Sequence, residues 1–514
     1  MFHYGEDHLT CRLAVAIAKG DTPASISATA QARVVAAHEA VLRAAAGEEA
    51  VYGINTGFGP LCSTIISAEN TALLQRNLLL SHSVGVGELL DPLTVRLLLV
   101  LKVHALARGF SGIAPEVLER IQFFLANDII PCVPSQGSVG ASGDLAPLSH
   151  LFLPLIGEGE VSYNGNIAES QSVLAEFNVQ PLTLGPKAGL ALINGTQYIA
   201  AHAVQAVARL QHCLAQADII AALMIEGLLG SSAPFRSGLH QLRAYPGCKH
   251  VAQRMAFLLR DSAINSSHLD CGRVQDPYSL RCVPQVHGAS RQAWLHLKEA
   301  VEIEINSVTD NPIVLSPEDI VSGGNFHGQP LALPLDYAAL AAAELGNISD
   351  RRAYLSLEGT VPGTPKLLLE DTGVNSGLMI VQYTSAALVS ENKSLCFPAS
   401  ADSIPTSLGQ EDHVSMGSIS SRKTLRIIDN LEKILGIELL CAAQAMEFRR
   451  PLRSSAALEA VHALVREHIA VATQDRYFGK DIAKAVELIK TGQVQAICAP
   501  HWPSTVLDKR FDGY

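Results

Sequence analysis

A glycine-rich segment from Ser135 to His150 holds the residues whose types and spacing are best suited to chemistry. Gly137, Gly140 and Gly143 recur at every third position, so the backbone can adopt conformations that are closed to residues with a Cβ atom. The spacing matches neither the dinucleotide fingerprint nor the phosphate-binding loop. A nucleophile elbow is also excluded, because Gly143 follows Ser142 directly. The segment is therefore a tight loop built for some other purpose.

Ala141, Ser142 and Gly143 within this loop could form an electrophile from the chain itself. If the backbone bends sharply, the amide nitrogen of Gly143 can attack the carbonyl carbon of Ala141, and loss of water closes a five-membered ring. A second dehydration removes the Ser142 hydroxyl and leaves an exocyclic methylene. The alternative is that Ser142 and Asp144 only cap a helix that begins near Leu145, since both side chains accept bonds from first-turn amides. For an isolated Ala-Ser-Gly the cap is the better interpretation, so the rest of the chain decides.

Other polar residues lie where ordinary structure does not require them. Tyr52 belongs to a segment, Val51 to Leu61, that is too rich in glycine for regular structure, and Asn194 interrupts a strongly apolar helical segment. A buried asparagine needs hydrogen-bond partners. Tyr278 and Arg281 would share one face of a helix at their spacing. Taken singly, Tyr52 would be a buried tyrosine with a satisfied hydroxyl, and Arg281 would form a surface salt bridge.

Together these motifs resemble the ammonia-lyases and aminomutases that carry a 4-methylidene-imidazol-5-one (MIO) group made from their own Ala-Ser-Gly. The resemblance recurs in order in blocks from Val51 to Met416 and continues at lower specificity to the C-terminus. It implies MIO, formed autocatalytically from Ala141-Ser142-Gly143, as the cofactor, with no metal and no dissociable group. A metal site at Glu411-Asp412-His413 is the alternative. The sequence disfavours it, because no histidines stand at zinc-ligand spacing.

The resemblance gives each matching residue a role. Tyr52 matches the catalytic base, whose phenol must ionise well below its reference pKa of roughly 10, through helix N-termini or an adjacent cation. Tyr278 matches a residue that assists proton movement or orientation. Asn194, Gln275 and Arg281 match residues that hold the amino-acid end of the substrate. Phe326 matches an aromatic residue of the active site. A guanidinium is the best available fork for a carboxylate, which suits Arg281.

Two positions bear on the substrate side chain. The pair Ser81-His82 resembles the histidine-specific members of the family, and Glu411 is a further match. An imidazole can bond to both His82 and Glu411, whereas an apolar ring would leave them buried without partners. The implied reaction is elimination of ammonia from L-histidine to give trans-urocanate, the first step of histidine degradation. One departure leaves specificity open, because the resemblance to several histidine-specific relatives implies a glutamate at the position where this chain has Gln329.

The composition and the apolar segments predict a mainly α fold. Hydrophobic residues make up 48% of the 514 residues and aromatic residues only 5%, with alanine and leucine dominant, which favours packed helices. Segments from Leu331 to Ile348, Leu378 to Leu395 and Ser415 to Arg449 predict a long-helix bundle, which the resemblance identifies as the fumarase/aspartase-like type. Locally, Thr22-Pro23 predicts a helix start and Asn164-Gly165 a hairpin turn.

The chain is expected to be one ammonia-lyase subunit. Its parts would be a loop-rich N-terminal region with the MIO loop (1–200), a central long-helix bundle (201–450) and a C-terminal helical cap (451–514). The net charge of −11 argues against nucleic acid and anionic membranes. Charged residues interrupt every long apolar run, and the ten cysteines lack any Cys-x-x-Cys pair, which favours a reducing cytoplasm. The resemblance implies a homotetramer whose active sites are each assembled from three chains.

Three alternatives remain open. A tyrosine or phenylalanine ammonia-lyase, or a 2,3-aminomutase, would use the same electrophile. Ser81-His82 and Glu411 disfavour aromatic substrates, but nothing in the sequence excludes slow mutase activity. A catalytically inactive helical scaffold belongs to a different class of protein, and the presence of Ala141-Ser142-Gly143 together with Tyr52 and Arg281 argues against it.

Overall fold

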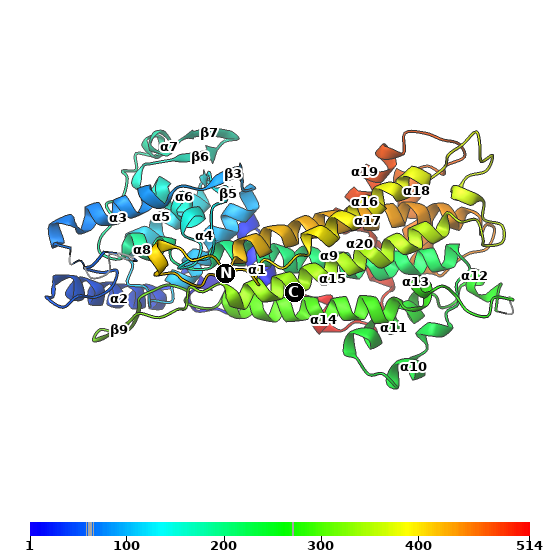
Figure 1. The fold of residues 1–514 in the computed structure, drawn as a ribbon, viewed down its shortest axis with the longest axis horizontal. Coiled ribbons are helices and arrows are strands. Elements are labelled where there is room, and N and C mark those ends of the chain that lie inside the picture. The colour runs from blue at the N-terminus through cyan, green and yellow to red at the C-terminus, as the bar shows by residue number, and fades with distance from the viewer. Residues whose placement is uncertain (58, 60–63, 65, 270–271) are drawn as a thin grey trace. The chain divides into compact units, whose positions relative to one another are not determined.

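The computed structural model describes residues 1–57, 59, 64, 66–269 and 272–514, and it is mainly helical, as the composition predicts. Two compact units divide the chain (Figure 1). Unit 1 comprises Met1–Gln205, Leu297–Asp336 and Pro398–Arg422, and unit 2 comprises Ala206–His296, Tyr337–Phe397 and Lys423–Tyr514. Each unit is discontinuous in sequence because the longest helices, α9 (Gln197–Gly227), α14 (Val283–Glu304), α15 (Gln329–Ser356) and α17 (Gly417–Glu447), contribute residues to both.

Unit 1 combines helices of moderate length with short strands. Its helices are α1 (Cys11–Lys19), α2 (Ala28–Ala46), α3 (Ala68–His82), α4 (Pro92–Leu106), α5 (Pro115–Ala126), α6 (Leu145–Phe152), α7 (Ser170–Glu176) and α8 (Ala188–Ile193). Its strands are β1 (Phe2–Tyr4), β2 (Ala24–Ile26), β3 (Val86–Leu89), β4 (Ile130–Pro131), β5 (Pro134–Gln136), β6 (Glu160–Tyr163), β7 (Asn166–Glu169), β8 (Ile313–Ser316) and β9 (Asp319–Val321). The pairs β1–β2 (parallel), β3–β5 and β8–β9, and the antiparallel sheet β4–β6–β7, fix the loops between the helices.

Local sequence signals account for several of these boundaries. Asn164 and Gly165 both have positive φ and join β6 to β7, which confirms the hairpin. Thr22-Pro23 was a wrong prediction, because the chain there enters β2 and no helix begins. The helix start lies further along, where the hydroxyl of Ser27 accepts from the amide of Ala30 at 3.0 Å and caps α2.

Unit 2 is built around the long helices. Its other helices are α10 (Ser237–Gln241), α11 (Pro246–Leu258), α12 (Ala263–Ser266), α13 (Tyr278–Arg281), α16 (Met379–Leu395), α18 (Ala456–His468), α19 (Phe478–Lys490), α20 (Gln493–Cys498) and α21 (Lys509–Asp512). The buried Trp294 of α14 donates its indole N–H to the Val207 carbonyl of α9 at 2.8 Å. Arg352 of α15 donates to Glu438 of α17 at 2.9 Å, with both side chains fully buried. The predicted bundle of long helices is confirmed.

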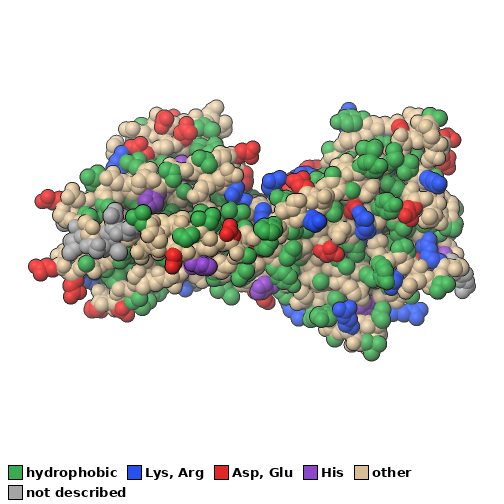
Figure 2. Space-filling view, in the orientation of Figure 1, with side chains coloured by type: hydrophobic (Ala, Val, Ile, Leu, Met, Phe, Trp, Pro, Cys, Tyr) green, Lys and Arg blue, Asp and Glu red, His purple; other side chains and the backbone are tan. Residues whose placement is uncertain are grey.

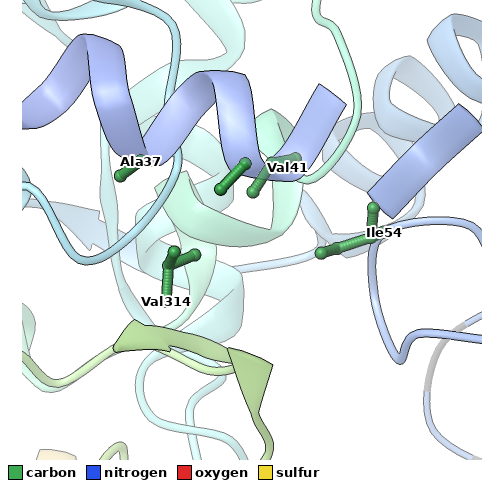
Figure 3. Packing of buried hydrophobic residues seen from close by; sticks show 5 residues of the cluster. Ala37, Val41, Ile54 and Val314 are labelled. Carbon is green, nitrogen blue, oxygen red and sulfur yellow. The ribbon is translucent and has the colours of Figure 1, made fainter. Parts of the chain in front are cut away.

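A small apolar cluster in unit 1 anchors the glycine-rich segment that begins at Val51. Ala37, Ala40 and Val41 on one face of α2 pack with Ile54 from that segment and with Val314 from β8 (Figure 3). Ile54 and Val41 are completely buried. The side chain of Ile54 thereby fixes this segment in a packed core.

Hydrophobic side chains also reach the surface. The space-filling view shows many of them in green between the charged groups (Figure 2). In unit 2, Tyr337 and Leu340 of α15 and Ile380 and Tyr383 of α16 are each at least half exposed. Across the described parts of the chain, no helix is both long enough and apolar enough to cross a membrane.

Candidate active site

A cavity of about 450 Å³ opens in unit 1 beside the Ala141–Gly143 turn. Helices α3, α6 and α8 form its walls, together with the segment after Val51 and the segment before α17. Its described lining residues are Tyr52, Gly57, Gly59, Thr64, Ile66, Leu74, Asn77, Leu78, Ser81, His82, Ser142, Leu145, Leu190, Ile193, Asn194, Ser407 and Glu411. Six of the residues singled out from the sequence therefore meet here: Tyr52, Ser81, His82, Ser142, Asn194 and Glu411.

The backbone turns sharply at Ser142 and Gly143. Ser142 has φ +54° and Gly143 has φ +83°, both in the left-handed region that favours glycine. Gly143 lies in a parallel bridge against Gly195, and a Cβ atom at Gly143 would come within 2.2 Å of the Gly195 carbonyl oxygen. Only glycine fits at this position, so the turn and the segment after α8 are pressed backbone to backbone. The small residues and positive φ values at this turn are compatible with the sharply bent backbone that the MIO interpretation expects.

Asp144 corrects the simple capping interpretation. Helix α6 does begin at Leu145, but the Asp144 side chain makes no bond to the first turn of α6. Its carboxylate instead accepts from the amide of Ile199 at 3.0 Å, at the start of α9, and from the hydroxyl of Ser138 at 3.2 Å. Burial raises the pKa of Asp144 to about 7, against the lowering effect of these hydrogen bonds. Asp144 therefore ties the loop to α9, and its backbone N–H donates to the Gly195 carbonyl at 2.8 Å.

His82 and Glu411 lie at the same cavity, as the sequence predicts for the residues near the substrate side chain. The hydroxyl of Ser81 is 2.9 Å from Nδ1 of His82. Burial lowers the pKa of His82, and the Leu78 carbonyl and the Glu411 carboxylate only partly oppose that effect. Oε1 of Glu411 accepts from the Ser142 hydroxyl at 3.4 Å. The imidazole is therefore neutral at neutral pH and can both donate and accept a hydrogen bond.

Two acceptors at this cavity have no partner among the described residues. Oε2 of Glu411 and Oδ1 of Asn194 are both buried and make no hydrogen bond there. A buried carboxylate or amide oxygen without a donor costs about 1–3 kcal/mol, which a ligand with N–H groups would recover. These two acceptor oxygens therefore suit a ligand that carries hydrogen-bond donors at both of its ends.

Tyr52 is held by the turn that follows Val51. The side-chain oxygen of Asn55 accepts from the Val51 amide at 2.8 Å, and the side-chain nitrogen donates to the Glu49 carbonyl at 2.8 Å. These bonds and the buried Ile54 fix the backbone on both sides of Tyr52. Among the described lining residues there is no Lys or Arg, so the cation expected beside Tyr52 is not supplied by the described cavity wall.

Gln275, Tyr278 and Arg281 lie in unit 2 and do not line this cavity. The Arg281 guanidinium lies 4.1 Å from the centre of the Tyr278 ring, which confirms that the two residues share a helix face. Nε of Arg281 donates to the Asp276 carbonyl at 2.9 Å, and no described carboxylate forms an ion pair with Arg281. Tyr278 is 72% exposed. This group presents an aromatic hydroxyl and a cation to its surroundings and gives no support to the salt-bridge alternative.

Phe326 and Gln329 also lie outside the lining. Phe326 is half-buried in the turn before α15. The Gln329 side-chain amide donates to the Ser400 carbonyl at 3.0 Å, a bond that a glutamate carboxylate cannot make. The glutamine at position 329 is therefore hydrogen-bonded within the protein, and it does not belong to the described cavity wall.

Three kinds of lining residue were not predicted from the sequence. Asn77 lies four residues before Ser81 on α3, so helical spacing could have placed both on one face. The apolar residues Leu190 and Ile193 of α8 carry no chemical signal. Ser407 belongs to a segment without regular periodicity, and nothing in the sequence marks it as part of a cavity.

The fold and the cavity describe a helical protein with a pocket beside a strained Ala-Ser-Gly turn, and comparison with known proteins identifies it as an enzyme. The chain belongs to the aromatic amino acid lyase family, whose pattern it matches over residues 9–467. A histidine ammonia-lyase from Sorangium cellulosum is 48% identical over 490 residues, covering 93% of this chain and 95% of the relative. Among solved structures, histidine ammonia-lyase from Trypanosoma cruzi is 40% identical, with a TM-score of 0.91 over 99% of this chain and 96% of its own.

The fold is shared with enzymes of other activity. Tyrosine aminomutase from Streptomyces globisporus is 34% identical, with a TM-score of 0.92 over 98% of this chain and 99% of its own. The fold alone therefore does not decide between elimination and amino-group migration, and the decision depends on the residues of the cavity.

We expect Gly143→Ala to destabilise the protein and to abolish activity, because its Cβ would meet the Gly195 backbone. Gly165→Ala is a matched control, since Gly165 has a similar φ of +78° with no atom within 4 Å of its notional Cβ. The control should lose only about 1 kcal/mol from backbone strain, and Gly143→Ala a further ~1–3 kcal/mol from overpacking. Thermal unfolding of both variants measures the difference. Equal melting temperatures would contradict the close approach of the two backbones.

Proposed function

We propose that this chain is a histidine ammonia-lyase that eliminates ammonia from L-histidine and releases trans-urocanate. The observation that carries the proposal is a pair of buried acceptors, Glu411 Oε2 and Asn194 Oδ1, which have no partner among the described residues and lie at the cavity that Ser142 lines. L-Histidine has N–H donors at both ends, on the imidazole and on the amine. A phenylalanine ring has none, and would leave the Glu411 carboxylate buried without a donor.

The residues divide the work of elimination between the two bonds that break. A ring closed from Ala141-Ser142-Gly143 would supply the electrophile that makes the amine a better leaving group. Asn194 would accept a hydrogen bond from the substrate amine, and Tyr52 would take the β-proton. The electron pair of the breaking C–H bond forms the new double bond as the C–N bond breaks. His82 and Glu411 would hold the imidazole so that these groups stay aligned.

Arg281, Tyr278 and Gln275 would complete the site from a neighbouring copy of the chain. The substrate carboxylate needs a cation, and the described lining of the cavity offers no Lys or Arg. Arg281 has no carboxylate partner among the described residues, and Tyr278 is exposed beside it. We therefore infer a homotetramer with shared active sites, in which Phe326 also contributes near the substrate.

The exposed apolar face of unit 2 supports association between copies. Tyr337, Leu340, Ile380 and Tyr383 lie on α15 and α16 with at least half of each side chain exposed. A groove beside them is lined by residues of the same two helices, among them Leu340 and Val389. Exposed apolar area of this kind is typical of surfaces that are covered in an oligomer.

A cytoplasmic location is part of the proposal. Cys11, Cys213 and Cys441 are buried free thiols, and burial raises the pKa of Cys441 to about 12. Buried thiols of this kind act as small core residues and suit a reducing compartment.

Tyrosine lyase or aminomutase activity is the alternative that the tyrosine aminomutase likeness keeps open, because a tyrosine hydroxyl could also donate to Glu411.

We expect ultraviolet absorbance to rise when purified protein receives L-histidine, and not when it receives L-tyrosine or L-phenylalanine. Ser142→Ala should remove the histidine signal while leaving the thermal unfolding of the protein unchanged. A rise in absorbance with tyrosine alone would show that the substrate is tyrosine and not histidine. Substantial turnover by Ser142→Ala would refute the proposal that Ser142 forms the electrophile.

Replacing Glu411 by glutamine should weaken the hydrogen bond to the imidazole of the substrate. The amide keeps the shape of the carboxylate but loses the charge, and a charge-assisted hydrogen bond is worth about 1.5–3 kcal/mol, so kcat/KM for histidine should fall roughly 10-fold to 100-fold. Asp412→Asn is the matched control, since Asp412 is exposed and does not line the cavity. Steady-state kinetics of both variants test this, and equal values for Glu411→Gln and wild type would remove Glu411 from the site.

Co-expression of two inactive variants tests the shared site. Ser142→Ala lacks the electrophile and Arg281→Ala lacks the carboxylate fork, so each homo-oligomer should be inactive. Hybrid oligomers would contain some sites with both groups intact, and activity should return in protein purified through a different tag on each variant. Hybrids that form and remain inactive would place Arg281 and Ser142 in the same chain's site.

A further inference from the structure

Lys102 is a charged residue in the core of unit 1 with no ion-pair partner among the described residues. It lies in α4 among apolar residues, and only 1% of its surface is exposed. Its Nζ donates to the backbone carbonyl of Asn194 at 2.5 Å and to Oε1 of Gln197 at 3.3 Å. A buried ammonium is costly, so a lysine held by neutral groups alone requires an explanation.

The surroundings fix which atoms face the ammonium. The Gln197 amide nitrogen donates to the Thr309 hydroxyl at 2.9 Å, which turns its oxygen toward Lys102. Burial lowers the pKa of Lys102 to about 7; the charge of Lys187 adds to this effect, while Asp310 and Asp144 oppose it. The two acceptor oxygens favour the protonated, charged form of the amine and so oppose the effect of burial.

The Asn194 carbonyl belongs to the peptide that contacts the Ala141–Gly143 turn. Asn194 ends α8 in an extended conformation, so its carbonyl is one of the groups that a helix end leaves without a helical partner. The other end of the same peptide, the N–H of Gly195, points to the Ser142 carbonyl oxygen at 3.5 Å. A peptide whose carbonyl accepts a charged hydrogen bond becomes a stronger donor at its N–H.

We propose that Lys102 is a positioning residue for the Ala-Ser-Gly turn. Its ammonium fixes and polarises the Asn194–Gly195 peptide, which in turn holds the Ser142 carbonyl while the ring closes. This inference rests on the proposed function and adds a residue to it. Lys102 touches neither the cavity nor the reacting atoms, and acts through one peptide bond.

The ring closure that Lys102 assists takes all of its atoms from Ala141, Ser142 and Gly143 and releases two molecules of water. The Gly143 nitrogen forms a bond to the Ala141 carbonyl carbon, and the Ala141 oxygen leaves as water with hydrogens from the Gly143 and Ser142 nitrogens. The second water takes the Ser142 hydroxyl and the hydrogen on its Cα atom. Both steps require the bend at Ser142 to be held, and the peptide fixed by Lys102 is one wall of that bend.

The test is the intact mass of Lys102→Met, which keeps an unbranched side chain, one atom shorter than that of lysine, and removes the donor. We expect the rate of double dehydration after synthesis to fall about tenfold, the equivalent of one charge-assisted hydrogen bond. The fraction of folded chains that have lost two waters, and the near-ultraviolet absorbance of the new group, should both drop. Circular dichroism and oligomeric size should stay as in wild type.

Lys187→Met is the matched control. Lys187 is equally buried, but its Nζ donates to the Ser111 carbonyl and to Asp310, both at 2.6 Å, and not to the peptide beside the turn. It should lower stability without lowering the dehydrated fraction of the folded chains. Equal dehydration in Lys102→Met and wild type, or equal losses in the two lysine variants, would overturn the positioning role.

Two further outcomes are distinguishable. If wild type itself keeps both waters, the proposed function fails before Lys102 is tested. If Lys102→Met does not fold, Lys102→Gln retains an N–H donor and is measured in the same way, with partial dehydration expected. Failure of both variants to fold while Lys187→Met folds would assign Lys102 to the core alone and overturn the proposal.

Discussion

The contact between two backbones, at Gly143 and Gly195, is the constraint on which the site depends. The two glycines pair directly, and the Asp144 amide and the Gly195 carbonyl close the contact at 2.8 Å. A Cβ atom on either partner would collide with its surroundings, at 2.2 Å for Gly143 and 2.5 Å for Gly195. Neither segment has enough local structure to hold a residue such as Ser142 at positive φ, so the strain is sustained by the packing around it.

Several elements brace this contact from different parts of the chain. Asp144 links the turn to the first residues of α9, and Tyr198 donates its hydroxyl to the Ser135 carbonyl at 2.7 Å. Ser418 at the start of α17 donates to the Ser138 carbonyl at 2.6 Å. A loop rich in glycine would otherwise sample many conformations. Its order comes from polar contacts to helices that are distant in sequence.

The sequence predicted those features that depend on local chemistry. The long helices, the hairpin at Asn164-Gly165 and the start of α6 at Leu145 all follow from periodicity and turn residues that act within a few positions. The meeting of Tyr52, His82, Asn194 and Glu411 at one cavity came from a family resemblance, because no periodicity relates residues so far apart. The true partner of Asp144 was missed for the same reason: an aspartate before a helix looks like its cap whichever helix it serves.

The sequence context of Lys102, a lysine within an apolar segment, carries information about its burial. In the sequence, Lys102 is one of the charged residues that interrupt the long apolar runs. The same residue also predicts a buried amine with acceptors converging on it, but the identity of those acceptors depends on tertiary packing. Burying a cation beside the turn costs free energy, which its hydrogen bonds must offset. In unit 1 the first atom it reaches is the carbonyl of the peptide that holds Ser142.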